Sequence, residues 1–296
     1  MPPVAAYKYL PPSLAERLRE LGLAVRKPVE GGLQGLHRSP HHGSSVEFAD
    51  YREYSRGDPP NLIDWAVYAR SDRHVIRRYQ EETNLRAYLL VDTSASMGFR
   101  ELGLHSKLEY ACFLAASLMC VLLNQADAAG LTLFNETIGQ SFPPTGSLEG
   151  LRPMLLALEA SKPAGRSQID RALHHLAEKI QRRSLVIVIS DLLQSPADIV
   201  RGLQHLHHNK HELLVLQTLD PAELGLSFSG LSELRDLETG ARLPVHADDL
   251  REAYAEEVQK FLDEIRRGCL DCLADYHLID TRWPVEETLH AKFGRA

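Results

Sequence analysis

The amino-acid sequence predicts an α/β fold built on a mostly parallel sheet with helices on both faces. Two runs, RAYLLVD at 86–92 and SLVIVISD at 184–191, are apolar throughout, as expected of strands buried on both faces. Segments with helical periodicity separate such runs from about residue 85 onward. Because parallel strands need long crossover connections, this alternation predicts right-handed βαβ units.

The expected elements follow one another without a repeat. After the first strand we expect further strands at 130–134, 184–191, 212–219 and 276–281, a short edge strand at 140–142, and helices at 107–124, 148–159, 168–182, 197–208, 248–274 and 285–293. Residues 225–247 interrupt this alternation and predict a hairpin beside the sheet. The main domain is therefore expected to span 85–296, with a hairpin insertion near 225–247.

The first 84 residues have a different character. Residues 12–25 are amphipathic and predict a short helix, whereas 28–46 are rich in Gly, Ser, His and Pro and predict a loop. We expect residues 1–84 to form an N-terminal helix and a β-containing segment packed on the main domain.

Composition restricts the class of protein. The 296 residues are 44% hydrophobic and 25% charged, with a formal net charge of -7, so nonspecific nucleic-acid binding is not expected. The N-terminus has no apolar run of signal-peptide type, and the longest apolar stretch, 111–123, is shorter than the roughly 20 residues that span a bilayer. These features predict a cytoplasmic protein without a membrane span.

Polar side chains follow the two clearest strands. The first ends in Asp92 and continues as Thr93-Ser94-Ala95-Ser96, and the second ends in Asp191. Open α/β sheets bind ligands beyond the carboxyl ends of their strands, where the strand order reverses. If these strands are neighbours, their carboxylates converge there, and the loop Gly165-Arg166-Ser167 can supply another hydroxyl.

Two carboxylates and three hydroxyls form a set of hard oxygen ligands. Such ligands suit Mg²⁺, Mn²⁺ or Ca²⁺ rather than zinc. The alternative is that these residues only cap strand-to-helix turns, since Ser and Asp are favoured there. The predicted metal ligands are Asp92, Ser94, Ser96, Ser167 and Asp191.

The order of these three pieces resembles the metal-ion-dependent adhesion site of von Willebrand factor A domains. By that resemblance the five residues would hold one divalent ion. One departure is that the family usually has Gly-Gly-Thr where this chain has Gly165-Arg166-Ser167. The hydroxyl is retained in Ser167, while the positive charge of Arg166 is expected to weaken metal binding.

A second resemblance covers the chain from about Gly32. The order EF, R-x-Y, GD, IDW and AR between residues 47 and 70 is similar to that of a bacterial family, domain of unknown function 58, whose members carry a von Willebrand A-like domain. The alternative for this signature is plain packing: a small core of Trp65, Phe48 and Tyr54, with internal ion pairs among Arg52, Asp58 and Asp64. The resemblance implies a protein-protein interaction module, an adaptor or co-chaperone for a MoxR-type AAA+ ATPase, because the genes often neighbour one another.

These features favour a binding protein over an enzyme. The chain has neither a Walker A sequence nor a GxGxxG that opens a helix, and SASMG lacks the first glycine of a GxSxG elbow. We expect a partner, the ATPase or its client, that presents an acidic residue to the ion. The alternative is a metal-dependent hydrolase that uses the same ion to activate water, which would need a general base in the crevice.

Overall fold

The structure of the chain is a computed structural model that describes residues 7–18, 21, 46–55, 57–58, 60–81, 85–226 and 228–293. Two compact units are present: Met1–Arg26 together with Leu85–Ala296, and Lys27–Asn84. The described residues 7–18 and 21 belong to the larger unit. Most of the predicted loop at 28–46 lies outside the described residues. The expected packing of the β-containing segment on the main domain stays a prediction.

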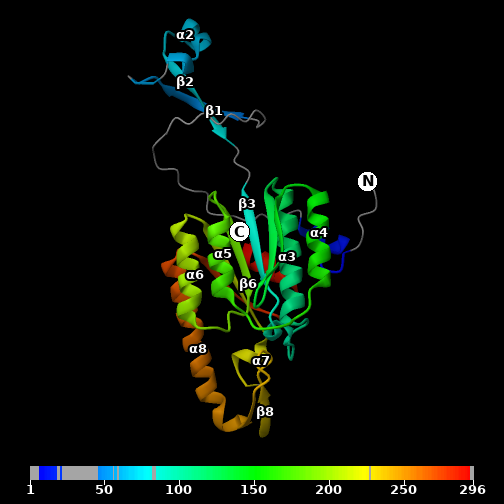
Figure 1. The fold of residues 1–296 in the computed structure, drawn as a ribbon. Helices are drawn as coiled ribbons and strands as arrows, with labels where there is room; N and C mark the ends of the chain where they lie inside the picture. Colours follow the sequence, from blue (N-terminus) through cyan, green and yellow to red (C-terminus); the bar gives the residue numbers. More distant parts are fainter. Residues whose placement is uncertain are drawn as a thin grey trace. The chain divides into compact units, whose positions relative to one another are not determined.

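A six-stranded sheet forms the centre of the larger unit (Figure 1), and five of its strands are parallel. Its order is β10 (Asp275–Asp280), β7 (Glu212–Leu219), β6 (Leu185–Ser190), β3 (Arg86–Asp92), β4 (Ala128–Phe134) and antiparallel β5 (Ile138–Thr145). All residues of β6 are buried, which explains its run of Val and Ile. Because β4 and β6 lie on opposite sides of β3, the strand order reverses between β3 and β6, as the predicted site requires.

Helices cover both faces of this sheet, so the predicted α/β class is confirmed (Figure 1). One apolar core lies against α1 (Pro12–Arg17), α3 (Lys107–Asn124), α4 (Leu148–Ala160) and α9 (Val285–Phe293). The other lies against α5 (Ile169–Lys179), α6 (Pro196–His208) and α8 (Ala247–Asp271). Successive side chains of β3 pack on opposite faces of the sheet: Leu89 belongs to the first core and Leu90 to the second.

Helix α3 is apolar nearly all round. Among the described residues it is one helix whose length and composition would allow it to cross a membrane, with a mean hydropathy of 1.4 over 18 residues. In this fold 72% of that window is buried inside the protein. A helix that is hydrophobic on every side is typical of a core element as well as of a membrane span.

The carboxyl ends of the parallel strands carry the smaller elements of this unit. The 3-10 helix η3 (Ala95–Gly98) follows β3, and the short helix α7 (Pro221–Leu224) follows β7. The predicted insertion is an antiparallel hairpin of β8 (Leu231–Arg235) and β9 (Arg242–His246). In Figure 1 α7 and β8 lie below the sheet, at the end opposite the start of β3.

The unit Lys27–Asn84 contains a two-stranded antiparallel sheet of β1 (Val46–Glu53) and β2 (Val75–Glu81). Between these strands lie the 3-10 helix η2 (Pro60–Leu62) and α2 (Trp65–Ser71). Asp64 caps α2, because its carboxylate accepts hydrogen bonds from two backbone N–H groups of the first turn. Trp65 is 57% exposed, so it is not the centre of a small core as the packing interpretation supposed.

The loop between η3 and α3 is anchored by Asp220, which is fully buried at the start of α7. Its carboxylate accepts hydrogen bonds from the backbone N–H groups of Glu101, Leu102 and Gly103 at 2.9–3.2 Å, and from Ala222 at 2.9 Å. Burial alone would raise the pKa of Asp220, but these donors outweigh it and lower the pKa. The loop that follows the DTSAS segment is therefore tied to the carboxyl end of β7.

We expect Asp220→Asn to lower the free energy of unfolding by about 1.5–3 kcal/mol at pH 7, because an amide group cannot accept from all four donors. A carboxyl whose pKa is lowered by folding contributes stability above its unfolded pKa of about 4 and loses it as pH falls further. Urea unfolding of the wild type and of Asp220→Asn should therefore show a difference in the free energy of unfolding that becomes smaller below pH 4. An equal difference at pH 3 and at pH 7 would contradict the anionic role of Asp220.

Candidate metal centre

The DTSAS segment forms a tight turn at the carboxyl end of β3. Asp92 is fully buried, and one of its carboxylate oxygens accepts a hydrogen bond from the Ser94 backbone N–H at 2.8 Å. The hydroxyl oxygens of Ser94 and Ser96 lie 3.1 Å apart. The Ala95 N–H donates to the Gly165 carbonyl at 2.9 Å, which joins this turn to the second predicted piece of the site.

The second piece is the loop before α5. Gly165 has a φ of +73°, a conformation that glycine adopts without strain. Two residues later the Ser167 hydroxyl donates to the other carboxylate oxygen of Asp92 at 2.7 Å. The side chain of Arg166 is exposed. Hydrogen bonds from Thr239 and Glu238 lower the pKa of Asp236 in the hairpin, and the positive charge of Arg166 adds to that effect.

The third piece lies at the end of β6, which pairs with β3, so the condition for the convergence of the two carboxylates is met. The Ser190 hydroxyl donates to the same Asp92 oxygen as Ser167 does, at 2.7 Å. Asp191 is buried next to it, and its carboxylate accepts from the Leu193 N–H at 3.2 Å. The structure thus brings the five predicted residues together at one strand end, although their binding of a metal stays a prediction.

A buried lysine that the sequence analysis did not single out lies beside Asp191. The ammonium of Lys107, in the first turn of α3, is fully buried and lies 2.8 Å from an Asp191 oxygen and 2.6 Å from a Glu223 oxygen. Burial disfavours the charged form, but the two carboxylates outweigh it and raise the pKa of Lys107. In the sequence Lys107 only begins an apolar helix, so nothing local indicates its partners.

A further carboxylate comes from the turn of the β8–β9 hairpin. Glu238 accepts a hydrogen bond from the Ser167 backbone N–H at 3.2 Å and another from the Ser96 hydroxyl. Its side chain is half-buried. The hairpin was predicted, but its contact with the site was not, because Ser167 and Glu238 lie 71 positions apart along the chain.

The charges of the site are unbalanced. Burial raises the pKa of Asp92 to about 6, and the negative charge of Asp191 adds to this effect. Burial and Asp191 also raise the pKa of Glu223 and of Glu238. The ammonium of Lys107 contacts two of these four carboxylates, those of Asp191 and Glu223, and the structure shows no such contact with Asp92 or Glu238. Buried like charges repel strongly, so a second cation would stabilise this arrangement.

The donor set suits a hard divalent cation. It consists of carboxylate and hydroxyl oxygens, without sulfur or imidazole nitrogen among the contacts given above, as Mg²⁺ and Mn²⁺ prefer. Within the described parts of the chain, no group of three or more His, Cys, Asp or Glu side chains is arranged to hold a metal. The predicted set is of another kind, because hydroxyls supply three of its five ligands. On the chemistry of these donors and the excess negative charge, the residues fit the ion.

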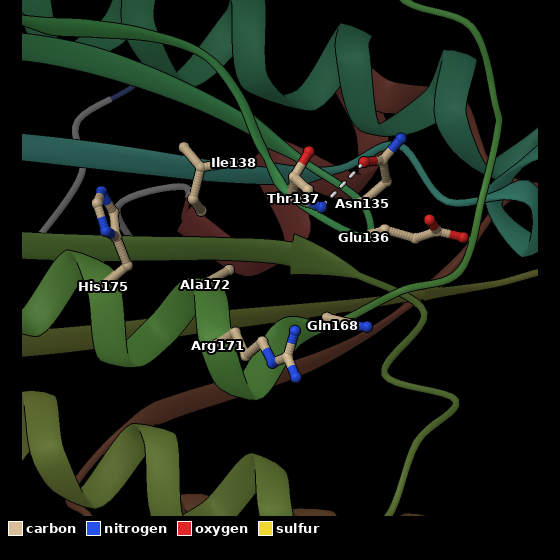
Figure 2. A pocket seen from close by; sticks show the side chains of 8 residues that line it. All are labelled: Asn135, Glu136, Thr137, Ile138, Gln168, Arg171, Ala172 and His175. Atoms are coloured by element: carbon tan, nitrogen blue, oxygen red, sulfur yellow. Dashed lines mark hydrogen bonds between the residues drawn. The ribbon is translucent and has the colours of Figure 1, made fainter.

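A pocket of about 220 Å³ lies between the β4–β5 turn and the start of α5 (Figure 2). Its walls come from the β4–β5 turn, where Thr137 N–H donates to the Asn135 side chain at 3.3 Å, and from the start of α5, where Arg171 projects. None of the five predicted ligands, all of which are described, lines this pocket. We therefore assign the site to the strand ends and not to this pocket.

Comparisons with known proteins agree with the fold. The chain is 29% identical over 265 residues to an uncharacterized protein of Mycobacterium tuberculosis, covering 88% of this chain and 83% of the relative. It is similar in structure to an aerotolerance-related membrane protein of Bacteroides fragilis, with 17% identity, a TM-score of 0.46 and coverage of 72% of this chain and 100% of that one. It is also similar to a von Willebrand factor type A protein of Catenulispora acidiphila, with 12% identity and a TM-score of 0.43. The match covers 74% of this chain and 44% of that one.

The predicted cytoplasmic location is contradicted by such neighbours. Two solved structures similar to this chain are described as an aerotolerance-related membrane protein and as a membrane spanning protein. The prediction was drawn from a polar N-terminus and a short apolar run. Those features show only how two segments distribute between water and a lipid bilayer. They do not determine where a protein of this fold resides.

The resemblance seen in the sequence is confirmed. Proteins with von Willebrand A domains are among the solved structures to which this chain is similar. A family model described as protein of unknown function DUF58 matches residues 50–262, which is more than half of the chain. The chain therefore belongs to the DUF58 family.

Proposed function

We propose that this chain is a metal-dependent protein-interaction module in which a divalent ion, held at the carboxyl ends of β3 and β6, receives a carboxylate from a protein partner. The observation that carries the proposal is the convergence of Asp92, Ser94, Ser96, Ser167 and Asp191 beside an excess of negative charge. The von Willebrand A-like fold itself supports a protein-interaction module. The proposal assigns no catalytic step to the chain.

The residues divide into two roles. The hydroxyls of Ser94, Ser96 and Ser167 are neutral ligands, while Asp92 and Asp191 supply the negative charge. A bound ion would act as a Lewis acid that attracts an anionic oxygen from a partner. Lys107 neutralises part of the charge of Asp191, so the ion would keep an affinity for a further carboxylate.

Exposed leucines near the site supply an apolar surface for such a partner. Leu193, two residues after Asp191, is 48% exposed, and Leu237, next to Glu238, is 43% exposed. Because one coordination bond competes with hydration and with the entropy of association, an interface needs apolar contacts of this kind around it.

The partner class follows from the family resemblance and from this chemistry. We propose a MoxR-type AAA+ ATPase or its client, because genes of this family often lie beside a gene for such an ATPase. The partner would present Glu or Asp to the ion and pack against the leucines around it. Under this proposal the chain acts as an adaptor or co-chaperone, and nucleotide hydrolysis belongs to the partner.

We expect the isolated chain to bind one Mg²⁺ or Mn²⁺ ion, and Asp92→Asn to weaken that binding by at least about tenfold, since it removes a charged ligand. Asparagine keeps an acceptor for the buried N–H and hydroxyl donors around Asp92, so it disturbs folding less than alanine would. Isothermal titration calorimetry measures both affinities, with circular dichroism as the check on folding. Asp263→Asn on the exposed side of α8 is the matched control. Equal affinities in the wild type and Asp92→Asn would refute the assignment.

We expect the complex with a MoxR-type ATPase to require the ion. Size-exclusion chromatography of the purified pair should show a complex in Mg²⁺ that dissociates with EDTA. Ser94→Ala should weaken the complex, because it removes one ligand hydroxyl with little change in volume, whereas Asp263→Asn should leave it intact. A complex of the same stability with and without the chelator would rule out a metal-bridged interface and direct attention to the exposed Trp65.

A further inference from the structure

Strand β5 forms one edge of the main sheet. It pairs with β4 on one side, and among the described residues no strand pairs with its other side. Residues 139–141 of this strand are exposed. Pro143 and Pro144 have no backbone N–H to donate, so they limit the open edge to residues 138–142. This part of β5 therefore offers backbone N–H and C=O groups to an additional strand.

The open part of β5 carries no charge. Native proteins commonly protect an edge strand with charged side chains, above all Lys, or cover it with a helix or loop. The sequence of residues 138–142, IGQSF, contains no such side chain. Its backbone is therefore suited to pair with an extended segment of another molecule, the strand addition by which many recognition domains bind peptides.

Helix α5 places a row of basic side chains beside this edge. Arg171, His175 and Lys179 lie four residues apart and therefore on one face of the helix, and all three are exposed. Arg171 and His175 line one pocket with Ile138, at the start of β5 (Figure 2). Further along, the Lys179 ammonium donates to the Ser141 hydroxyl at 3.0 Å. The basic row therefore follows β5 from its start to its middle.

The described part of the chain leaves this row without counter-charges. No described carboxylate forms an ion pair with Arg171 or Lys179. Glu136, the carboxylate among the residues that line the pocket, accepts a hydrogen bond from the Arg166 backbone N–H at 3.1 Å. Two cations without ion-pair partners beside an open strand edge favour a segment with acidic side chains.

The spacing of the basic row matches that of a strand. Residues four apart on a helix are displaced by about 6 Å along its axis, and alternate residues of a strand by about 6.6 Å. Side chains that point to one face of an added strand can therefore meet Arg171, His175 and Lys179 in turn. An acidic residue at every second position places each carboxylate on the side of α5.

We propose that the open edge of β5 and the basic row of α5 bind an extended acidic segment of a protein partner. The segment adds a strand to the sheet and directs alternate Glu or Asp side chains toward α5. This interaction goes beyond the proposed metal centre and does not require the ion. A second copy of the chain suits the edge poorly, because pairing β5 with β5 about a twofold axis brings two basic rows together.

The test uses the full-length chain and a short fluorescein-labelled peptide in which Glu alternates with Thr. Fluorescence anisotropy measures its affinity in EDTA, which keeps the carboxylates from binding an ion at the strand ends. We expect saturable binding, and none of a peptide with Lys in place of Glu. The double variant Arg171→Gln/Lys179→Gln should weaken binding by about tenfold, because two charge contacts are lost. Arg152→Gln/Arg201→Gln, at exposed positions of α4 and α6, is the matched control, with circular dichroism as the check on folding.

Backbone pairing is tested on the peptide, so that folding of the chain is not disturbed. The N–H groups of alternate residues in a strand point to opposite edges, so N-methylation of all Glu or of all Thr residues blocks one edge only. We expect one methylated peptide to bind at least about tenfold more weakly and the other to bind like the unmethylated peptide. Equal affinities of the two methylated peptides would refute strand addition.

Two further results would overturn the proposal. Equal affinities of the Arg171→Gln/Lys179→Gln variant and its control would show that the basic row does not contribute. If the wild type does not bind the acidic peptide, the edge has no such partner, and a dimer in sedimentation equilibrium would then assign it to a second copy. Because the titrations contain EDTA, each of these results leaves the metal centre untouched.

Discussion

The buried carboxylate of Asp92 is the interaction around which the strand ends are organised. It accepts hydrogen bonds from the turn after β3, from the loop before α5 and from the last residue of β6. A buried carboxylate without donors would be costly, so these three segments must reach it for the fold to be stable. The requirement that stabilises the native structure thus also brings the predicted metal ligands together.

A second chain of contacts runs from Asp191 away from the sheet. Lys107 joins Asp191 to Glu223, and a Glu223 oxygen accepts from the backbone N–H of Asp220 at 2.9 Å. Asp220 in turn holds the loop that leads back to α3. The first turn of α3, the start of α7 and the end of β6 are therefore coupled by buried charges. Breaking one partner of such a chain leaves an uncompensated charge, which is more costly than losing a surface ion pair.

The sequence predicted the fold and the convergence of the strand-end residues well, because both depend on local patterns. The buried runs of β3 and β6 and the helices between them follow from apolar periodicity, and parallel pairing then brings Asp92 and Asp191 to the same edge. Lys107 and Glu238 were missed. Each is an ordinary residue in its local context, and its importance arises only when elements 84 and 71 residues apart along the chain come into contact.

The two missed residues change how the site is understood. The sequence predicted a site with two carboxylates and an open coordination position. In the structure, the buried ammonium of Lys107 lies next to Asp191, and the carboxylate of Glu238 from the hairpin contacts Ser167. Lys107 is fully buried in α3, so its charge is a permanent part of the core. Glu238 belongs to an exposed hairpin with its own small sheet, so its contact with the site can be lost without unfolding the main sheet. Any change in the charge balance of this site is therefore expected to come from the hairpin.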